Sequence, residues 1–266
     1  MSGGWELVPR PWRAGAWAAA VVAAMAAATA TAEEQAAVPD LVLPPRDMCA
    51  VPRSLLPSVS SLRHIHAAWV RGEPIVIVTI GSGSTAGSTS GGESHAYPNY
   101  LQAQLAAKFP NREIKVVNHG HPGESAQKLA ARFPTEVVPD KPNLVIWQTG
   151  TVDAVRSLDV DTFATTVNGG IAFLEASRSD VVLVNPQYAS RMELLIHYDP
   201  YLAAMEQAAG QSDAILFDRY RVMRYWVAKG RFDLSSGSRE VRRKNAEESQ
   251  ACIGVVLGDV IARALQ

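Results

Sequence analysis

The stretch that decides the fold is Pro-Ile-Val-Ile-Val-Thr-Ile-Gly-Ser-Gly-Ser-Thr-Ala-Gly, residues 74–87. Its first half is a run of β-branched residues, which is typical of a strand that is buried on both faces. Its second half is a glycine-rich turn with small hydroxyl side chains, where α/β enzymes place a nucleophile or a phosphate-binding loop. The turn carries hydroxyls at Ser82, Ser84 and Thr85, but Gly83 stands where the nucleophile is expected.

Further short apolar runs follow this one along the chain. They are Ile114–Asn118, Leu144–Trp147, Val181–Asn185 and Ile215–Asp218. Between them, apolar residues recur at helical spacing, as Val160, Phe163 and Val167 do. This alternation predicts a three-layer α/β/α sandwich with a five-stranded, mostly parallel sheet, formed by a single domain over residues 58–266. Functional loops are expected at the carboxyl ends of the strands.

The composition is that of an ordinary globular protein. The chain has 266 residues, of which 47% are hydrophobic and 19% charged, and its formal net charge is −1. Such a balance gives no electrostatic basis for binding nucleic acid or an anionic membrane. The densest basic cluster is Arg239, Arg242, Arg243 and Lys244. We interpret it as the solvated start of a helix.

The N-terminal segment has the pattern of a secretory signal peptide. Arg10 and Arg13 precede the apolar run Ala14–Ala32, which ends in a small-x-small sequence before two glutamates. This pattern predicts cleavage after Ala32 and a periplasmic or secreted protein, with no membrane contact after cleavage. An uncleaved N-terminal anchor is the alternative, because the run approaches the ~20 residues of a spanning helix. Residues 33–57, rich in proline and alanine, are expected to form an N-terminal arm.

The chain has two cysteines, Cys49 and Cys252, at opposite ends of the expected mature protein. Export would place them in an oxidising compartment, where a disulfide between them is expected. Such a bridge would stabilise the fold by about 4–5 kcal/mol in the chain-entropy model. Two buried free thiols are the alternative.

Two more strand-end loops carry unusual residues. Asn-His-Gly-His-Pro-Gly-Glu-Ser occupies residues 118–125, and Thr-Gly-Thr-Val-Asp occupies residues 149–153. Together with the first turn, these loops resemble in order and strand context the SGNH (GDSL) hydrolase superfamily of esterases and lipases, in particular its GSSST-like subgroup. The resemblance covers residues 49–266. It implies an SGNH-hydrolase or flavodoxin-like sheet and a serine–histidine–aspartate site whose oxyanion is stabilised by backbone amides and an asparagine.

Matched to the family motifs, this sequence departs from them where the chemistry is done. Gly83 stands at the nucleophile position and Val152 at the asparagine position, whereas Gly120 matches the oxyanion glycine. Gly150 and Asp153 complete the third loop. The motifs of the resemblance are therefore degenerate.

The terminal aspartate–histidine motif of the family is missing as well. No histidine occurs after His197. Counting back from Cys252 with the family's spacing places Lys244 at the histidine position and Val241 at the aspartate position.

Two functions are compatible with this pattern. The first is an exported, non-catalytic relative that binds a small molecule or a carbohydrate in the retained pocket. The alternative is a periplasmic esterase or deacylase that acts on acylated carbohydrate or small esters through relocated residues. For that alternative, the candidates are Ser82, Ser84, His119, His121 and Asp153, with His95 as a further base.

Simpler structural roles are open for the same residues. Gly83 would serve a turn that needs a positive φ, and Asp153 would cap the helix that follows it. His64 with His66, or the histidines of the cleft, form no closed set of metal ligands. We therefore expect no metal and no cofactor.

Overall fold

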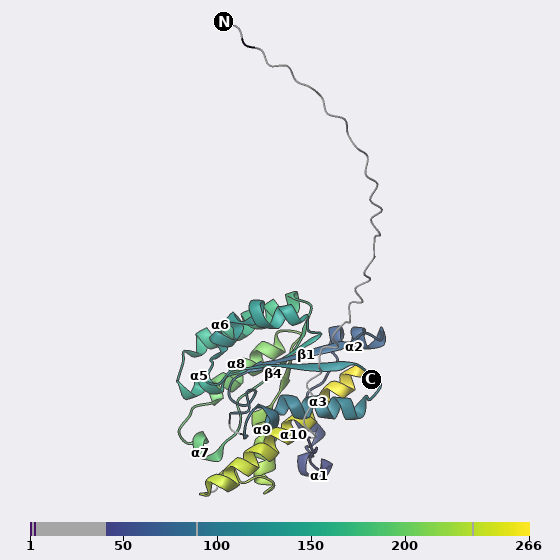
Figure 1. Cartoon of the computed structure of the whole chain (residues 1–266). Coiled ribbons are helices and arrows are strands. Elements are labelled where there is room, and N and C mark those ends of the chain that lie inside the picture. The colour runs from purple at the N-terminus through teal and green to yellow at the C-terminus, as the bar shows by residue number, and fades with distance from the viewer. Residues whose placement is uncertain (2, 4–40, 89, 236) are drawn as a thin grey trace. The chain divides into compact units, whose positions relative to one another are not determined.

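The computed structural model describes residues 1, 3, 41–88, 90–235 and 237–266 (Figure 1). The leader expected at residues 1–32, with its cleavage point, falls outside the described residues apart from Met1 and Gly3. The chain divides into two units, Met1–Ala37 and Val38–Gln266, and the account below concerns the second. Across the described residues, no helix combines the length and the apolar character needed to cross a membrane.

A five-stranded parallel sheet forms the centre of this unit. Its strands are β1 (Ile75–Gly81), β2 (Ile114–Gly120), β3 (Leu144–Gln148), β4 (Asp180–Val184) and β5 (Ile215–Phe217). They lie in the order β2-β1-β3-β4-β5, and every pairing is parallel. The predicted sandwich is thereby confirmed. In register, Gly81 lies opposite Gly120 and Ile80 opposite Trp147, so the loops after β1, β2 and β3 emerge at one edge of the sheet.

Helices cover both faces of the sheet. The α-helices are α1 (Arg46–Cys49), α2 (Arg63–Val70), α3 (Tyr97–Lys108), α4 (Ala126–Ala131), α5 (Thr151–Val155), α6 (Val160–Ala176), α7 (Ser190–Glu193), α8 (Asp199–Gly210), α9 (Arg219–Ala228) and α10 (Arg239–Leu265). Shorter helical turns are η1 (Arg53–Leu55), η2 (Glu93–His95), η3 (Phe133–Val137) and η4 (Val138–Asp140). Helix α6 packs with α4 and α8 on one side, and α3 packs with α10 on the other (Figure 1).

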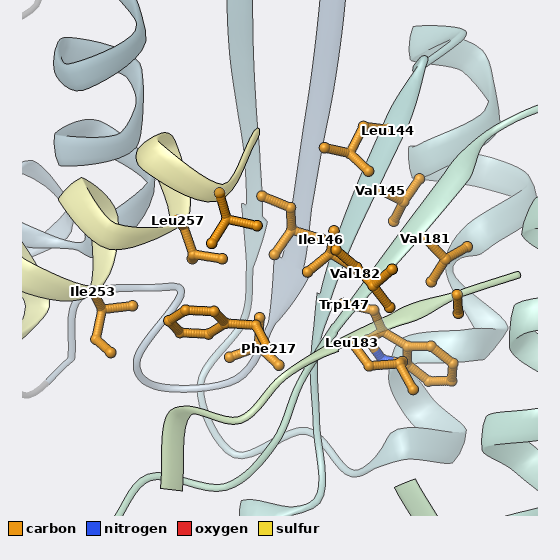
Figure 2. Close-up of a cluster of buried hydrophobic side chains, with 14 of the residues drawn as sticks. Leu144, Val145, Ile146, Trp147, Val181, Val182, Leu183, Phe217, Ile253 and Leu257 are labelled. Carbon is orange, nitrogen blue, oxygen red and sulfur yellow. The ribbon is translucent and has the colours of Figure 1, made fainter. Parts of the chain in front are cut away.

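The core forms where these layers meet. Figure 2 shows the Phe217 ring of β5 pointing toward Ile253 and Leu257 of α10. On the other side of the sheet, the Trp147 ring lies edge-on to Phe133, with 5.0 Å between their centroids. All five side chains are buried, and each contributes roughly 1.5–3 kcal/mol through the hydrophobic effect.

Two glycines bring α10 into close contact with α3. A Cβ at Gly254 would lie 2.5 Å from the Tyr97 carbonyl oxygen, and one at Gly258 would lie 2.6 Å from Gln104 Cγ. Glycine at both positions therefore sets the separation of the two helices. Because α3 follows the turn after β1, this contact also fixes α10 relative to the candidate site.

A disulfide joins Cys49 of α1 to Cys252 of α10, as the sequence led us to expect. The Cα atoms of the two cysteines are 4.9 Å apart. Next to the bridge, Trp226 Nε1 donates a hydrogen bond to the Ala50 carbonyl at 3.3 Å. The described part of the predicted arm, residues 41–57, thus includes α1 and η1 and is tied to the last helix.

Replacing both Cys49 and Cys252 with serine is expected to lower the free energy of unfolding by about 4–5 kcal/mol. The reason is that the bridge spans 203 residues and its loss frees the unfolded chain. Urea denaturation of the two proteins measures the difference. A reducing agent should destabilise the wild type by a similar amount and leave the double variant unchanged. A loss below ~1 kcal/mol would contradict a structural role for the bridge.

Candidate functional site

The turn after β1, residues 81–87, is held by the side chain of Gln148. Gln148 ends β3 and is buried, and its Oε1 accepts hydrogen bonds from Ser82 N–H at 3.1 Å and from the Thr85 hydroxyl at 3.2 Å. The Thr85 Oγ also lies 3.3 Å from the Tyr97 hydroxyl at the start of α3. Because a satisfied buried network rigidifies its surroundings, these bonds hold the turn in one conformation.

The second loop closes onto the same turn at Gly120. A Cβ at this position would lie 2.5 Å from the backbone of Thr85 and of Ala86, so only glycine fits. The Asn118 side chain donates to the Thr85 carbonyl at 2.9 Å and accepts from the Gly120 N–H at 3.0 Å. The Gly120 amide, to which the resemblance assigns an oxyanion role, is therefore hydrogen-bonded within its own loop.

Gly83 is under no such constraint. Its φ is not positive, in contrast to Gly87 and Gly123, so the turn does not need glycine here for its backbone angle. The interpretation of Gly83 as a positive-φ residue is therefore wrong. A Cβ at Gly83 would have Ser88 Cβ and Oγ as its nearest neighbours, both at 3.8 Å. The fold has room for a serine at this position, and the sequence lacks one.

The side chains of the two serines beside Gly83 are hydrogen-bonded to neighbouring loops. Ser82 Oγ accepts a hydrogen bond from the Gly123 N–H at 3.1 Å, and the Ser84 hydroxyl donates to Gln187 Oε1 at 3.1 Å. Both serines are buried. In the hydrogen bonds of the described residues, neither hydroxyl is joined to an imidazole. A serine–histidine pair at this turn is therefore not assembled from Ser82 or Ser84.

His119 faces an acidic cluster on η3 and η4. Its Nε2 lies 2.7 Å from Asp140 Oδ2 and its Nδ1 lies 3.8 Å from Glu136 Oε2. Hydrogen bonds from Arg132 hold the pKa of Glu136 below its ordinary value, and the positive charges of His121 and His119 add to this effect. His121 itself is exposed. The Nε2 of His119 is thus committed to the Asp140 carboxylate.

Asp153 links the third loop to the second. Gly150, with φ +87, directly precedes α5, and the Asp153 carboxylate accepts hydrogen bonds from the Ala126 N–H at 3.0 and 3.2 Å. Asp153 lies within α5 and binds the first amide of the earlier helix α4, so the expectation that it caps the helix that follows it is wrong. Burial raises the pKa of Asp153, and the hydrogen bond from Ala126 opposes that rise. Val152, at the position where the resemblance places an asparagine, is half-buried and offers no donor.

A cavity of about 420 Å³ opens beside the turn. Ser88, next to the Gly83 Cβ position, lines it, as does Gln187, the partner of Ser84. Its volume lies in the range of small-molecule sites. Neither Gln148 nor Gln187 is among the candidate site residues predicted from the sequence. Their partners, Ser82 and Ser84, lie 66 and 103 residues away, so no local signal identifies either glutamine.

The amino-terminal residues of α10 form part of the wall of this cavity. Arg239, Arg242 and Arg243 line it, whereas Lys244 does not. The predicted helix start is correct, but the description of the arginines as merely solvated is incomplete. Lys244, at the position expected for the catalytic histidine, is exposed and lies 3.9 Å from Glu248.

Metal ligation finds no support in the described ranges. They contain no group of three or more histidine, cysteine, aspartate and glutamate side chains placed to hold a metal ion. His66 Nδ1 lies 2.9 Å from the Ala264 carbonyl oxygen, and the His64 backbone N–H donates to Asp180 at 3.1 Å.

Comparison with known proteins places this site in context. The model of the non-GDSL lipase-like family matches residues 48–266. A search of curated proteins gives no significant match. Several solved structures share the fold. Acetylxylan esterase Axe2 from Geobacillus stearothermophilus superposes with a TM-score of 0.56 at 20% identity, covering 72% of this chain and 94% of its own.

Two other structures are similar to the same extent. The α/β hydrolase LAE5, from the metagenome of Lake Arreo in Spain, has a TM-score of 0.55 at 21% identity, with 73% of this chain and 97% of its own covered. TesA has a TM-score of 0.56 at 16% identity, and the match covers 69% of this chain and 97% of TesA. At these identities the likeness establishes an SGNH-hydrolase-like fold.

Two alanine substitutions test which of the two loop glycines, Gly83 or Gly120, the fold requires. Gly83→Ala should leave the free energy of unfolding unchanged or raise it by up to about 1 kcal/mol, because its Cβ meets no atom within 3.8 Å and alanine restricts the unfolded chain. Gly120→Ala should lower it by about 1–3 kcal/mol or more, because its Cβ overlaps backbone.

Thermal and urea unfolding of both variants beside the wild type measure these differences. Equal destabilisation by the two substitutions would show that Gly83 is, after all, a structural glycine.

Proposed function

We propose that this chain, which belongs to the non-GDSL lipase-like family, is an exported protein that binds a small molecule or a carbohydrate without hydrolysing it. The observation that carries the proposal is Gly83. The turn is fully built around this position, a serine would fit there, and no hydroxyl is present. Removing a serine nucleophile typically costs on the order of 10⁶-fold in rate.

The other departures support the same conclusion. Val152 removes a side-chain donor to the oxyanion, and a single such donor is worth roughly 2.7–4 kcal/mol of barrier. Lys244 replaces the histidine that would take the proton. These losses come from three separate segments of the chain, yet the loops remain hydrogen-bonded to one another. Loops that remain in place without the catalytic groups can still bind a ligand.

Carbohydrate is favoured as a ligand class by the fold comparison. Axe2, which shares this fold, is an acetyl-xylooligosaccharide esterase. The cavity beside Gly83 has the volume of a sugar-sized site, and hydroxyl and amide side chains such as Ser88 and Gln187 line it.

Ester hydrolysis by relocated residues is the second candidate function, and one contact favours it. His95 Nδ1 lies 2.8 Å from Glu247 Oε1, a pair of the kind that orients a general base. A Cβ at Gly91, which lines the cavity, would lie 3.7 Å from His95 Cδ2. In this alternative, Ser88 on the cavity wall would be the nucleophile.

Turnover of p-nitrophenyl acetate and of acetylated xylan tests the proposal. The wild type is expected to hydrolyse both at the buffer rate. Gly83→Ser is expected to fold and to remain inactive, because Lys244 and Val152 still replace the other groups.

Two controls identify any activity that is found. Turnover abolished by Ser88→Ala and by His95→Asn would establish the second candidate and overturn the first. Turnover abolished instead by Ser82→Ala or Ser84→Ala would also overturn the first candidate, and it would replace Ser88 as the nucleophile of the second.

A further inference from the structure

The wall of the cavity beside Gly83 concentrates positive charge. Arg239, Arg242 and Arg243 come from the first turns of α10 and line the cavity together. No aspartate or glutamate lines it within the described part of the chain. Since α10 has 27 residues, its amino end adds the positive pole of a long helix dipole to the same wall.

Several acidic side chains near this wall have partners elsewhere, and Glu240, in the first turn of α10, is exposed and does not line the cavity. Glu247 of α10 pairs with His95 at 2.8 Å, and Glu248 lies 3.9 Å from Lys244. Glu193 accepts a hydrogen bond from the Tyr220 hydroxyl at 2.9 Å. Arg239 and Arg243 are exposed at the cavity, and Arg242 is half-buried there and donates to the Gly237 carbonyl at 2.9 Å.

A buried amide marks the inner end of the cavity. Gln250 lines it, its side chain is 3% exposed, and its Oε1 has no hydrogen-bond partner among the described residues. Because unpartnered buried polar atoms are rare, this amide oxygen indicates a place where a hydroxyl group of a ligand would donate a hydrogen bond. Ser249 lines the cavity beside Gln250.

A fourth arginine, Arg219, lies one helical turn from Met223, which lines the cavity. Arg219 is completely buried at the start of α9, and only its Nε has a partner, the Asn185 carbonyl at 3.0 Å. Burial lowers the pKa of Arg219 to about 10. Met223, one helical turn further along α9, lines the cavity, which places Arg219 on the same face of that helix.

From these observations we infer that the cavity selects an organic anion, namely a small molecule or sugar that carries a carboxylate or phosphate group. Arginine is suited to this role because its planar guanidinium donates paired hydrogen bonds to both oxoanions. Met223 and Leu234 add apolar side chains to a lining that also holds Ser88, Gln187, Ser249 and Gln250, so the cavity fits the apolar and hydroxyl parts of such a ligand. The inference rests on the proposed function in taking the same cavity as the ligand site.

Three sugars that differ in charge test the inference with the purified protein. Isothermal titration calorimetry with glucuronate, glucose 6-phosphate and glucose should give at least about tenfold tighter binding of the two anions. Raising the salt concentration should weaken anion binding several-fold and leave glucose binding unchanged. The dissociation constants of glucuronate and glucose 6-phosphate then show whether the site prefers a carboxylate or a phosphate.

A matched set of variants locates the binding. Arg239→Gln with Arg243→Gln removes two exposed charges from the cavity wall, and we expect it to abolish the tenfold preference for the anions. Lys244→Gln removes a charge from the same helix outside the cavity, and binding should stay at the wild-type value. Circular dichroism confirms that the variants are folded.

The outcomes separate this inference from the proposed function. Equal affinity for glucose and its anionic analogues, or an equal loss in the Lys244→Gln control, would overturn anion selection while leaving a ligand-binding protein. Absence of anion binding up to about 10 mM would overturn it as well. Ester turnover would overturn the proposed function without touching the preference for anions.

Discussion

The contact on which the rest of the site depends is the one between Gly120 and the backbone of Thr85 and Ala86. There is no space for a Cβ between these segments, so the loops after β1 and β2 are locked together. Gln148 adds the third loop by accepting hydrogen bonds from the same turn. Asp153 then ties the third loop to the start of α4. Each loop is therefore positioned by its neighbours, and none of these contacts involves the position of the missing nucleophile.

This separation explains how a fold of the esterase type can persist without its chemistry. Gly83 is tolerated because it contributes only its backbone, whose carbonyl accepts a hydrogen bond from the Ser88 N–H at 2.9 Å, and no side chain is needed there to hold the turn. Ser82 and Ser84, by contrast, serve as hydrogen-bond partners for Gly123 and Gln187. Hydroxyls used in this way stabilise the loops and are not available in the pose of a nucleophile. Folding of the seven-residue turn requires the hydrogen bonds made by the residues beside Gly83, whereas hydrolysis would require a hydroxyl at residue 83 itself.

Much of the fold could be predicted from local pattern. The β-branched run before Gly81 identified β1, and the same pattern identified the other strands, because strands buried on both faces are apolar nearly throughout. The role of Gln148 could not be predicted, since its partner Ser82 lies 66 residues away. The position of Arg239 on the cavity wall could not be predicted either. A helical pattern does not show which side chains border a cavity that distant segments form.

The central claim is that the turn is intact and its nucleophile is lost, and a fluorophosphonate probe tests it most directly. Such probes react only with a serine that a neighbouring base has activated. Intact-mass measurement after prolonged incubation of the purified protein should show the unmodified mass. A single stoichiometric adduct on Ser82, Ser84 or Ser88 would contradict the claim, because it would show an activated serine at this site.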